Sequence, residues 1–178
     1  MNLRHALPVA LLSLLLPLLA QENDDKATHR EVEMLDVRFQ RFGCLCLDGK
    51  GRLLAGDAGA KTIKVLSTDG KLLSELKPGL PAEAIAVAPN GAIYCGGGGK
   101  LAELTPDGKV VRTVPLPADA ASAIPQRRRK TRPNQVSGIA VTKNYVFATI
   151  GSGWSVGAKA KLYRFNRELS DAKVLLTG

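Results

Sequence analysis

The most concentrated chemistry in this 178-residue sequence lies in residues 127–132, where five of six side chains are cationic. They are Arg127, Arg128, Arg129, Lys130 and Arg132. The whole sequence holds 25 Lys and Arg against 16 Asp and Glu, a formal net charge of +9, so this segment carries much of the excess. Guanidinium groups bind carboxylates, sulfates and phosphates through paired hydrogen bonds. The segment is therefore interpreted either as a solvated loop or as an anion-binding patch, and both interpretations stay open.

A second segment, residues 151–160, contains Gly-Trp-Ser-Val-Gly at 153–157, which matches the nucleophile-elbow pattern of serine hydrolases. That elbow needs a following helix and a histidine base. A strand-like stretch follows instead, and the one histidine beyond residue 20 is His29. We interpret the segment as a loop, in which Trp154 and Lys159 are further binding candidates.

Glycines 96–99 followed by Lys100 suggest a phosphate cradle, but two positions depart from the Walker pattern. Tyr94 stands where glycine is required, and Leu101 stands where serine or threonine is required. A glycine-rich connection between two strands fits better.

Three cysteines invite a metal or redox interpretation: Cys44, Cys46 and Cys95. Cys44 and Cys46 share one face of any strand that contains them, but no second cysteine or histidine pair completes a zinc set. Small buried core residues are the favoured interpretation, and the sequence leaves their pairing open. We predict no cofactor.

The N-terminus has the layout of a secretory signal peptide. Residues 1–5 are basic, residues 6–19 are largely apolar, and Ala20 provides a small residue at the cut. No later apolar run approaches the roughly 18 residues that span a bilayer, which predicts no transmembrane segment in the mature chain. We expect cleavage after Ala20 and a secreted or periplasmic protein.

Internal repeats determine the predicted architecture. Residues 45–57 match residues 85–97 at an offset of 40 and match residues 139–149 with one deletion, and a second unit recurs at 62–73, 100–111 and 161–166. Each repeat alternates short apolar segments with Asp-Gly, Asn-Gly or glycine-rich turns, the pattern of antiparallel hairpins. Four strands recurring about every 40 residues indicate a β-propeller. The predicted fold class is all-β, an incomplete β-propeller of about three four-stranded antiparallel blades.

The domain boundaries follow from this alignment. The predicted domains are a signal peptide at 1–20, a tail with a possible first strand at 21–42, and a partial propeller at 43–178. Within the propeller, the blades lie at 43–77, 83–115 and 136–178. The insertion loops lie at 115–136 and 151–160. Three blades are too few to close a ring. The chain is then either a fragment of a longer propeller or half of a six-bladed homodimer, and both alternatives stay open.

Alternating strand direction predicts where the two insertions lie. The connections between the second and third strands emerge at the same end of a blade as the connections between blades. Both insertion loops should therefore share one face, with the basic segment, Trp154 and Lys159 on it. Lengthened loops on a rigid scaffold commonly carry recognition.

The stretch Ile85-Ala-Val-Ala-Pro-Asn-Gly-Ala-Ile-Tyr94 resembles the recurrent motif of NHL-repeat propellers and their SMP-30/gluconolactonase-like relatives. The resemblance covers residues 43–178 and implies a six-bladed ring. Gluconolactonase-like members are metal-dependent lactone hydrolases with acidic and asparagine ligands at the central channel. Asn134 is similar to one such ligand, which makes a divalent metal such as calcium or zinc the alternative cofactor. The expected innermost strands, at 44–47, 84–87 and 138–141, are small and apolar, and such residues offer a divalent cation few oxygen ligands.

The favoured hypothesis is a non-enzymatic exported scaffold that binds an anionic partner through its insertion face. Acidic polysaccharide, an anionic lipid surface or an acidic protein would suit the arginines. Aromatic residues make up 4% of the sequence, which leaves few rings for stacking bases and argues against nucleic acid. The alternative is a metal-dependent lactone hydrolase with its site in the channel.

Overall fold

The computed structural model describes residues 36–120, 135–151 and 160–177. Every regular element in these ranges is a β-strand, apart from one turn of 3-10 helix, η3 (Ala118–Ala120). Among the described residues, no helix is long and apolar enough to cross a bilayer. The all-β prediction is confirmed.

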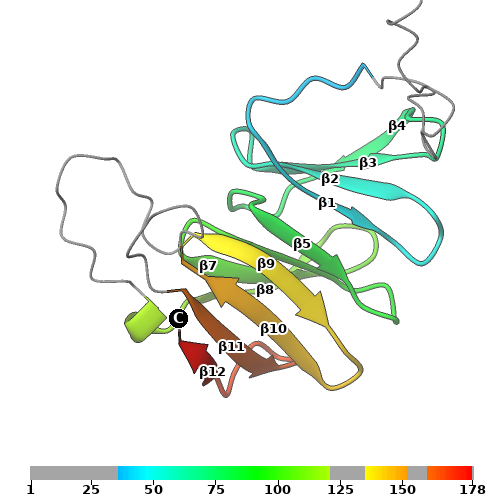
Figure 1. Ribbon diagram of the computed structural model, residues 1–178. Helices are drawn as coiled ribbons and strands as arrows, with labels where there is room; N and C mark the ends of the chain where they lie inside the picture. Colours follow the sequence, from blue (N-terminus) through cyan, green and yellow to red (C-terminus); the bar gives the residue numbers. More distant parts are fainter. Residues whose placement is uncertain (1–35, 121–134, 152–159, 178) are drawn as a thin grey trace, which may run out of the picture. The chain divides into compact units, whose positions relative to one another are not determined.

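Twelve strands form three four-stranded antiparallel sheets, and within each sheet the strands lie in chain order. Sheet A contains β1 (Phe42–Leu47), β2 (Leu53–Asp57), β3 (Thr62–Leu66) and β4 (Leu72–Leu76). Sheet B contains β5 (Ala84–Val87), β6 (Ile93–Gly97), β7 (Lys100–Leu104) and β8 (Val110–Pro115). Sheet C contains β9 (Val136–Val141), β10 (Tyr145–Ile150), β11 (Lys161–Asn166) and β12 (Lys173–Thr177). The first strands of consecutive sheets are neighbours, β1 against β5 and β5 against β9 (Figure 1).

Short turns join the first strand to the second and the third to the fourth in each sheet. Most begin with a residue whose side-chain oxygen accepts a backbone N–H from the far side of the turn. Examples are Asp48 with Arg52, Thr105 with Lys109, and Asn166 with Ser170. Such side chains satisfy backbone donors locally, which explains why Asp, Asn, Ser and Thr recur there.

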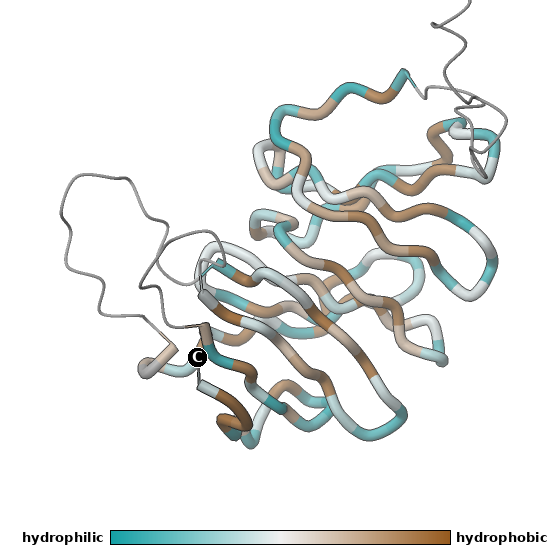
Figure 2. Tube along the Cα trace, in the orientation of Figure 1, coloured by the Kyte–Doolittle hydropathy of each residue, from teal (hydrophilic) through white to brown (hydrophobic). Residues whose placement is uncertain are grey.

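Apolar side chains fill the two interfaces between neighbouring sheets. Leu54, Ile63 and Val65 of sheet A pack with Ile93 and Cys95 of sheet B. A second cluster joins sheets B and C, with Tyr94 and Leu101 on one side and Val146, Tyr163 and Phe165 on the other. Sheet B is therefore buried on both faces, and its brown apolar segments in Figure 2 run along the strands.

Glycine allows the sheets to approach closely at equivalent positions of β2 and β6. A Cβ at Gly56 would lie 2.6 Å from the carbonyl oxygen of Ala82, and one at Gly96 would lie 2.7 Å from Cγ1 of Val136. Both distances are too short for a side chain. The recurrence of glycine at the offset of 40 is thus a packing requirement.

The face of sheet C that points away from sheet B carries large apolar side chains. Tyr145 is 39% exposed and Leu176 is 66% exposed, while Val146 and Ile150 on the other face are fully buried. The rings of Tyr145 and Phe147 meet edge to face, and the guanidinium of Arg164 lies 4.6 Å from the centroid of the Tyr145 ring.

Candidate functional site

The two longer connections leave the described sheets from neighbouring strand ends. In sheet C, Val136 pairs with Ile150, and Ile150 pairs with Lys161, so β9 begins where β10 ends and β11 begins. In sheet B, Pro115 at the end of β8 pairs with Lys100 at the start of β7. The N–H of the next residue, Leu116, donates to the carbonyl oxygen of Gly99. We call this end, where the second and third strands of a sheet connect, the loop end.

The predicted binding residues are not among those that the structure describes. Arg127, Arg128, Arg129, Lys130, Arg132, Asn134, Trp154 and Lys159 all lie in residues 121–134 and 152–159, outside the described ranges. The flanking strands do show that both segments attach at the loop end of adjoining sheets. The anion-binding prediction for these residues stays a prediction.

At the base of the loop end, a buried carboxylate links all three sheets. The side chain of Glu83 is 6% exposed and lies 3.6 Å from Nη2 of Arg41, which precedes β1. The N–H of Val136, which begins β9, donates to the other carboxylate oxygen at 3.4 Å. Glu83 itself precedes β5, so its two oxygens join the starting points of the three innermost strands.

A second buried carboxylate, Asp57 at the end of β2, holds the chain that leads into β1. It is 1% exposed and accepts four backbone N–H groups, from Gln40, Arg41, Gly59 and Ala60, at 2.8–3.1 Å. Burial alone would raise the pKa of Asp57, but the four donors outweigh it and hold the pKa below its ordinary value. Asp57 therefore stays ionised, and its role is structural.

The glycine-rich stretch that suggested a phosphate cradle forms the tight connection between β6 and β7. Gly98 and Gly99 have φ values of 59° and 78°, the left-handed region that favours glycine. A Cβ at Gly97 would lie 2.0 Å from the carbonyl oxygen of Pro81. Conformation and close packing account for these glycines.

The three cysteines lie at the interface between sheets A and B as free thiols. Burial raises the pKa of the Cys44 thiol to about 12, and it also raises the pKa of Cys46 and of fully buried Cys95. Protonated buried thiols are poor nucleophiles and poor metal ligands. Cys95 fits the interpretation as a small core residue, whereas Cys44 and Cys46 are partly buried and pack against this core.

Within the described ranges, no three His, Cys, Asp or Glu residues gather closely enough to hold a metal ion. The innermost strands β1, β5 and β9 expose no carboxylate of their own, and nearby Glu83 already contacts Arg41 and Val136. These residues do not fit a divalent cation, which prefers several oxygen ligands.

One residue that the sequence did not single out, Arg167, joins sheets B and C. Its Nε donates to the hydroxyl of Tyr94 at 2.9 Å, and its Nη1 donates to the carbonyls of Thr142 and Lys143. Its Nη2 donates to Oδ1 of Asn90, while the Tyr94 hydroxyl donates to the carbonyl of Arg167. One strand and two turns from sheets B and C thus contact a single guanidinium. Nothing in its local sequence marks it, since its partners are up to 77 residues away.

No protein-family profile matches the sequence, and no curated protein matches it. Solved structures do resemble its fold. Kuenenia stuttgartiensis hydrazine synthase superposes with a TM-score of 0.59 at 14% identity, over 83% of this chain and 41% of that one. A chain of the mitotic checkpoint complex gives 0.54 at 13% identity over 82% and 41%, and the RRP9 WD40 repeats give 0.54 at 12% over 82% and 40%.

WD40 repeats are β-propellers, and their blades are four-stranded antiparallel sheets in chain order, as sheets A, B and C are. This chain has a β-propeller fold. Each of its three sheets is a blade, and the predicted fold class is confirmed. At these identities the likeness shows the fold alone, and the chain spans about two fifths of the length of each solved structure.

Proposed function

We propose that this protein is an exported β-propeller scaffold of the NHL type that binds an anionic partner through its loop end. The observation that carries the proposal is the attachment of both longer connections at adjoining strand ends. One of these connections holds five cations in six residues, and the other holds the sole tryptophan of the sequence. Arginine-rich loops that also offer an aromatic ring suit a sulfated or carboxylated polysaccharide.

The propeller supplies the rigidity that such a site needs. Glu83, Arg41 and Val136 join the starts of the innermost strands, and Asp57 holds the entry into β1. Binding loops that attach to a fixed base lose less conformational freedom on association, which strengthens binding.

Replacing Arg127, Arg128 and Arg129 with alanine is expected to lower the salt concentration at which the protein elutes from heparin-agarose. Each lost phosphate-like or sulfate-like contact also reduces the slope of affinity against salt, by about one unit per contact. The matched control replaces Lys71, Lys109 and Lys143 with alanine, which removes the same charge from exposed turns. Equal shifts for the two triple variants would mean that net charge alone governs retention and would refute the patch.

Export is part of the same proposal and rests on the layout of residues 1–20. Expression of the full chain in a secreting host, followed by intact-mass measurement, is expected to give residues 21–178 outside the cytoplasm. An Ala20→Arg variant should block that cut and serves as the control. A product that retains Met1 in the exported fraction would contradict the proposal.

The lactone-hydrolase alternative rests on the sequence resemblance alone. Asn134 lies outside the described residues, and the side chains around the innermost strands offer apolar surface. We therefore derive no reaction step for it.

A further inference from the structure

A groove lies between sheets A and B, on the side of the short turns and away from the loop end. Its volume is about 740 Å³, within the range of about 300–1,000 Å³ that is usual for small-molecule sites. Its lining includes the turn at residues 48–52, the middle of sheet A, and the turn at residues 87–91 of sheet B. No residue that we assign to the proposed anionic-partner site lines it.

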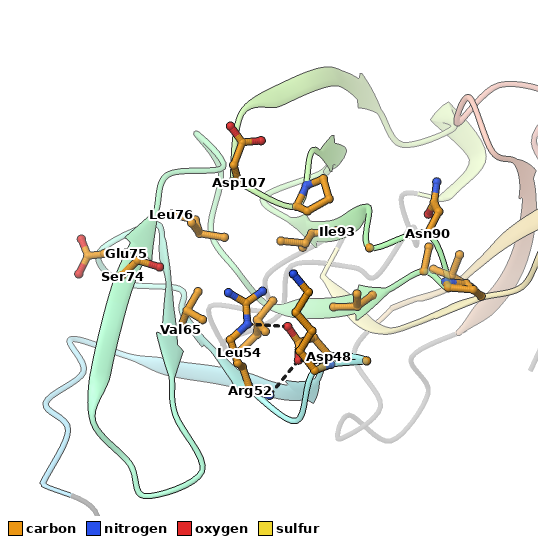
Figure 3. Close-up of a pocket in the computed structure, with 18 residues that line it drawn as sticks. Asp48, Arg52, Leu54, Val65, Ser74, Glu75, Leu76, Asn90, Ile93 and Asp107 are labelled. Atoms are coloured by element: carbon orange, nitrogen blue, oxygen red, sulfur yellow. Dashed lines mark hydrogen bonds and ion pairs between the residues drawn. The ribbon is translucent and has the colours of Figure 1, made fainter.

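The floor of the groove is apolar and belongs to the core between the two sheets. Leu54, Val65 and Ile93 are each at most 3% exposed, and Leu76 is 8% exposed. Figure 3 shows these four side chains around the middle of the groove. A ligand with an apolar chain could extend this core by covering them.

A guanidinium stands over that floor in a fixed position. Nε of Arg52 donates to Oδ2 of Asp48 at 2.7 Å, and Oδ1 of Asp48 accepts the N–H groups of Lys50 and Arg52. These contacts hold the pKa of Asp48 below its ordinary value despite its burial, so its carboxylate stays charged. Within the described ranges, the two Nη atoms of Arg52 have no hydrogen-bond partner, and Figure 3 shows them pointing into the groove.

Besides the pair of Asp48 and Arg52, the charged residues that line the groove are the carboxylates Glu75 and Asp107 and the cation Lys50. Asp107 lies at the rim, where it accepts a hydrogen bond from Thr105 and lies 3.7 Å from Nζ of Lys109. The carboxylate of Glu75 points away from the groove in Figure 3. Asp48 is already paired with Arg52, and Lys50 adds another cation to the lining.

We propose that this groove binds a small organic carboxylate with an apolar chain, its carboxylate on the Nη atoms of Arg52 and its chain over Leu54, Val65, Leu76 and Ile93. A guanidinium offers two parallel donors, which match the two oxygens of a carboxylate. Asp48 acts as a positioning residue, because it binds the Nε side and leaves the Nη side free. The proposal is independent of the anionic-partner site at the loop end.

The test is calorimetric titration of the full chain with octanoate, octanamide and octylamine. Octanoate is expected to bind at least about tenfold more tightly than octanamide, and octylamine should bind no better than octanamide, since only the anion complements Arg52. In the series acetate, butyrate, hexanoate and octanoate, affinity should rise about threefold to fourfold per methylene while the floor is being covered. Affinity that does not depend on chain length would overturn the proposal.

Two variants locate the site. Arg52→Gln should reduce octanoate affinity to that of octanamide, whereas Lys100→Gln, an exposed cation at the loop end, should leave it unchanged. If Arg52→Gln does not fold, Lys50→Gln takes its place and is expected to weaken octanoate without affecting octanamide. An equal loss of octanoate affinity in Lys100→Gln would show that octanoate pairs with cations non-specifically, and it would refute the site. A short apolar peptide with a free C-terminal carboxylate that binds more tightly than octanoate would replace the proposed occupant.

Discussion

Replacing Asp57 with alanine is expected to lower the free energy of unfolding by roughly 3–5 kcal/mol. The carboxylate is 1% exposed and accepts four backbone N–H groups, so its removal leaves four partly buried donors without this acceptor. Each orphaned donor costs about 1–3 kcal/mol, reduced where water can enter. Urea unfolding monitored by circular dichroism measures the effect.

The matched control is Asp107→Ala, because the Asp107 carboxylate also accepts a hydrogen bond, from Thr105, but its side chain is 63% exposed. The Asp107→Ala substitution should change the free energy of unfolding little. A similar loss of stability in the two variants would contradict the role given to the buried carboxylate.

The same residue predicts a pH dependence. The folded-state pKa of Asp57 lies below its ordinary value of 3.8, so its stabilising contribution is fully present above about pH 4 and is lost as the pH falls through the folded-state pKa. Asp57→Asn removes the charge but keeps one acceptor oxygen. The stability difference between wild type and Asp57→Asn should therefore shrink between pH 7 and pH 3, and a constant difference would mean that the charge contributes nothing.

Replacing Arg167 with methionine is expected to cost about 2–3 kcal/mol and to loosen sheet C from sheet B. Methionine keeps much of the length of the side chain but removes the hydrogen bonds to Tyr94, Asn90, Thr142 and Lys143. Hydrogen bonds from a charged donor contribute about 1.5–3 kcal/mol when partly buried. Hydrogen exchange should increase in β9–β12 before it increases in sheet A.

Arg164→Met provides the matched control for Arg167. It removes an arginine three residues away whose guanidinium stacks on the half-exposed ring of Tyr145, a contact worth at most about 1 kcal/mol. A double-mutant cycle of Arg167→Met with Tyr94→Phe should show a coupling of about 1–2 kcal/mol. Additive effects would mean that Arg167 does not act through the Tyr94 hydroxyl.

The strands were predictable because their signals are local and repeated. Apolar alternation and turn residues recur at an offset of 40, so Leu54 and Gly56 anticipate Tyr94 and Gly96 in the next sheet. The turn residues Asp48 and Thr105 stand where their side chains accept hydrogen bonds across a turn.

The contacts that hold the entry into β1 and those that join sheets B and C were not predictable in the same way. Asp57 meets Gln40 and Arg41 across 16–17 residues, and Arg167 meets Tyr94 across 73. A single sequence gives no signal for such partners, because their meeting depends on how whole sheets pack. The groove had no sequence signature either, since its lining comes from sheets A and B and from Val141 of sheet C.

The cationic segment shows the opposite situation. Its chemistry is plain from the residues alone, while its geometry depends on a long connection that no repeat constrains. The register of β9, β10 and β11 gives its point of attachment, which is as much as local strand pairing can provide.

Gly56 and Gly96 let the next blade approach, and the same register position in sheet C is Thr149, which pairs with Leu162 and Gly138. Its hydroxyl accepts a hydrogen bond from Ser137 and stands where the other two blades have only hydrogen. The blades are therefore not interchangeable units. A tandem array built by copying sheet A or sheet B would preserve the spacing between units, whereas one built from sheet C would have to accommodate a branched side chain at every junction.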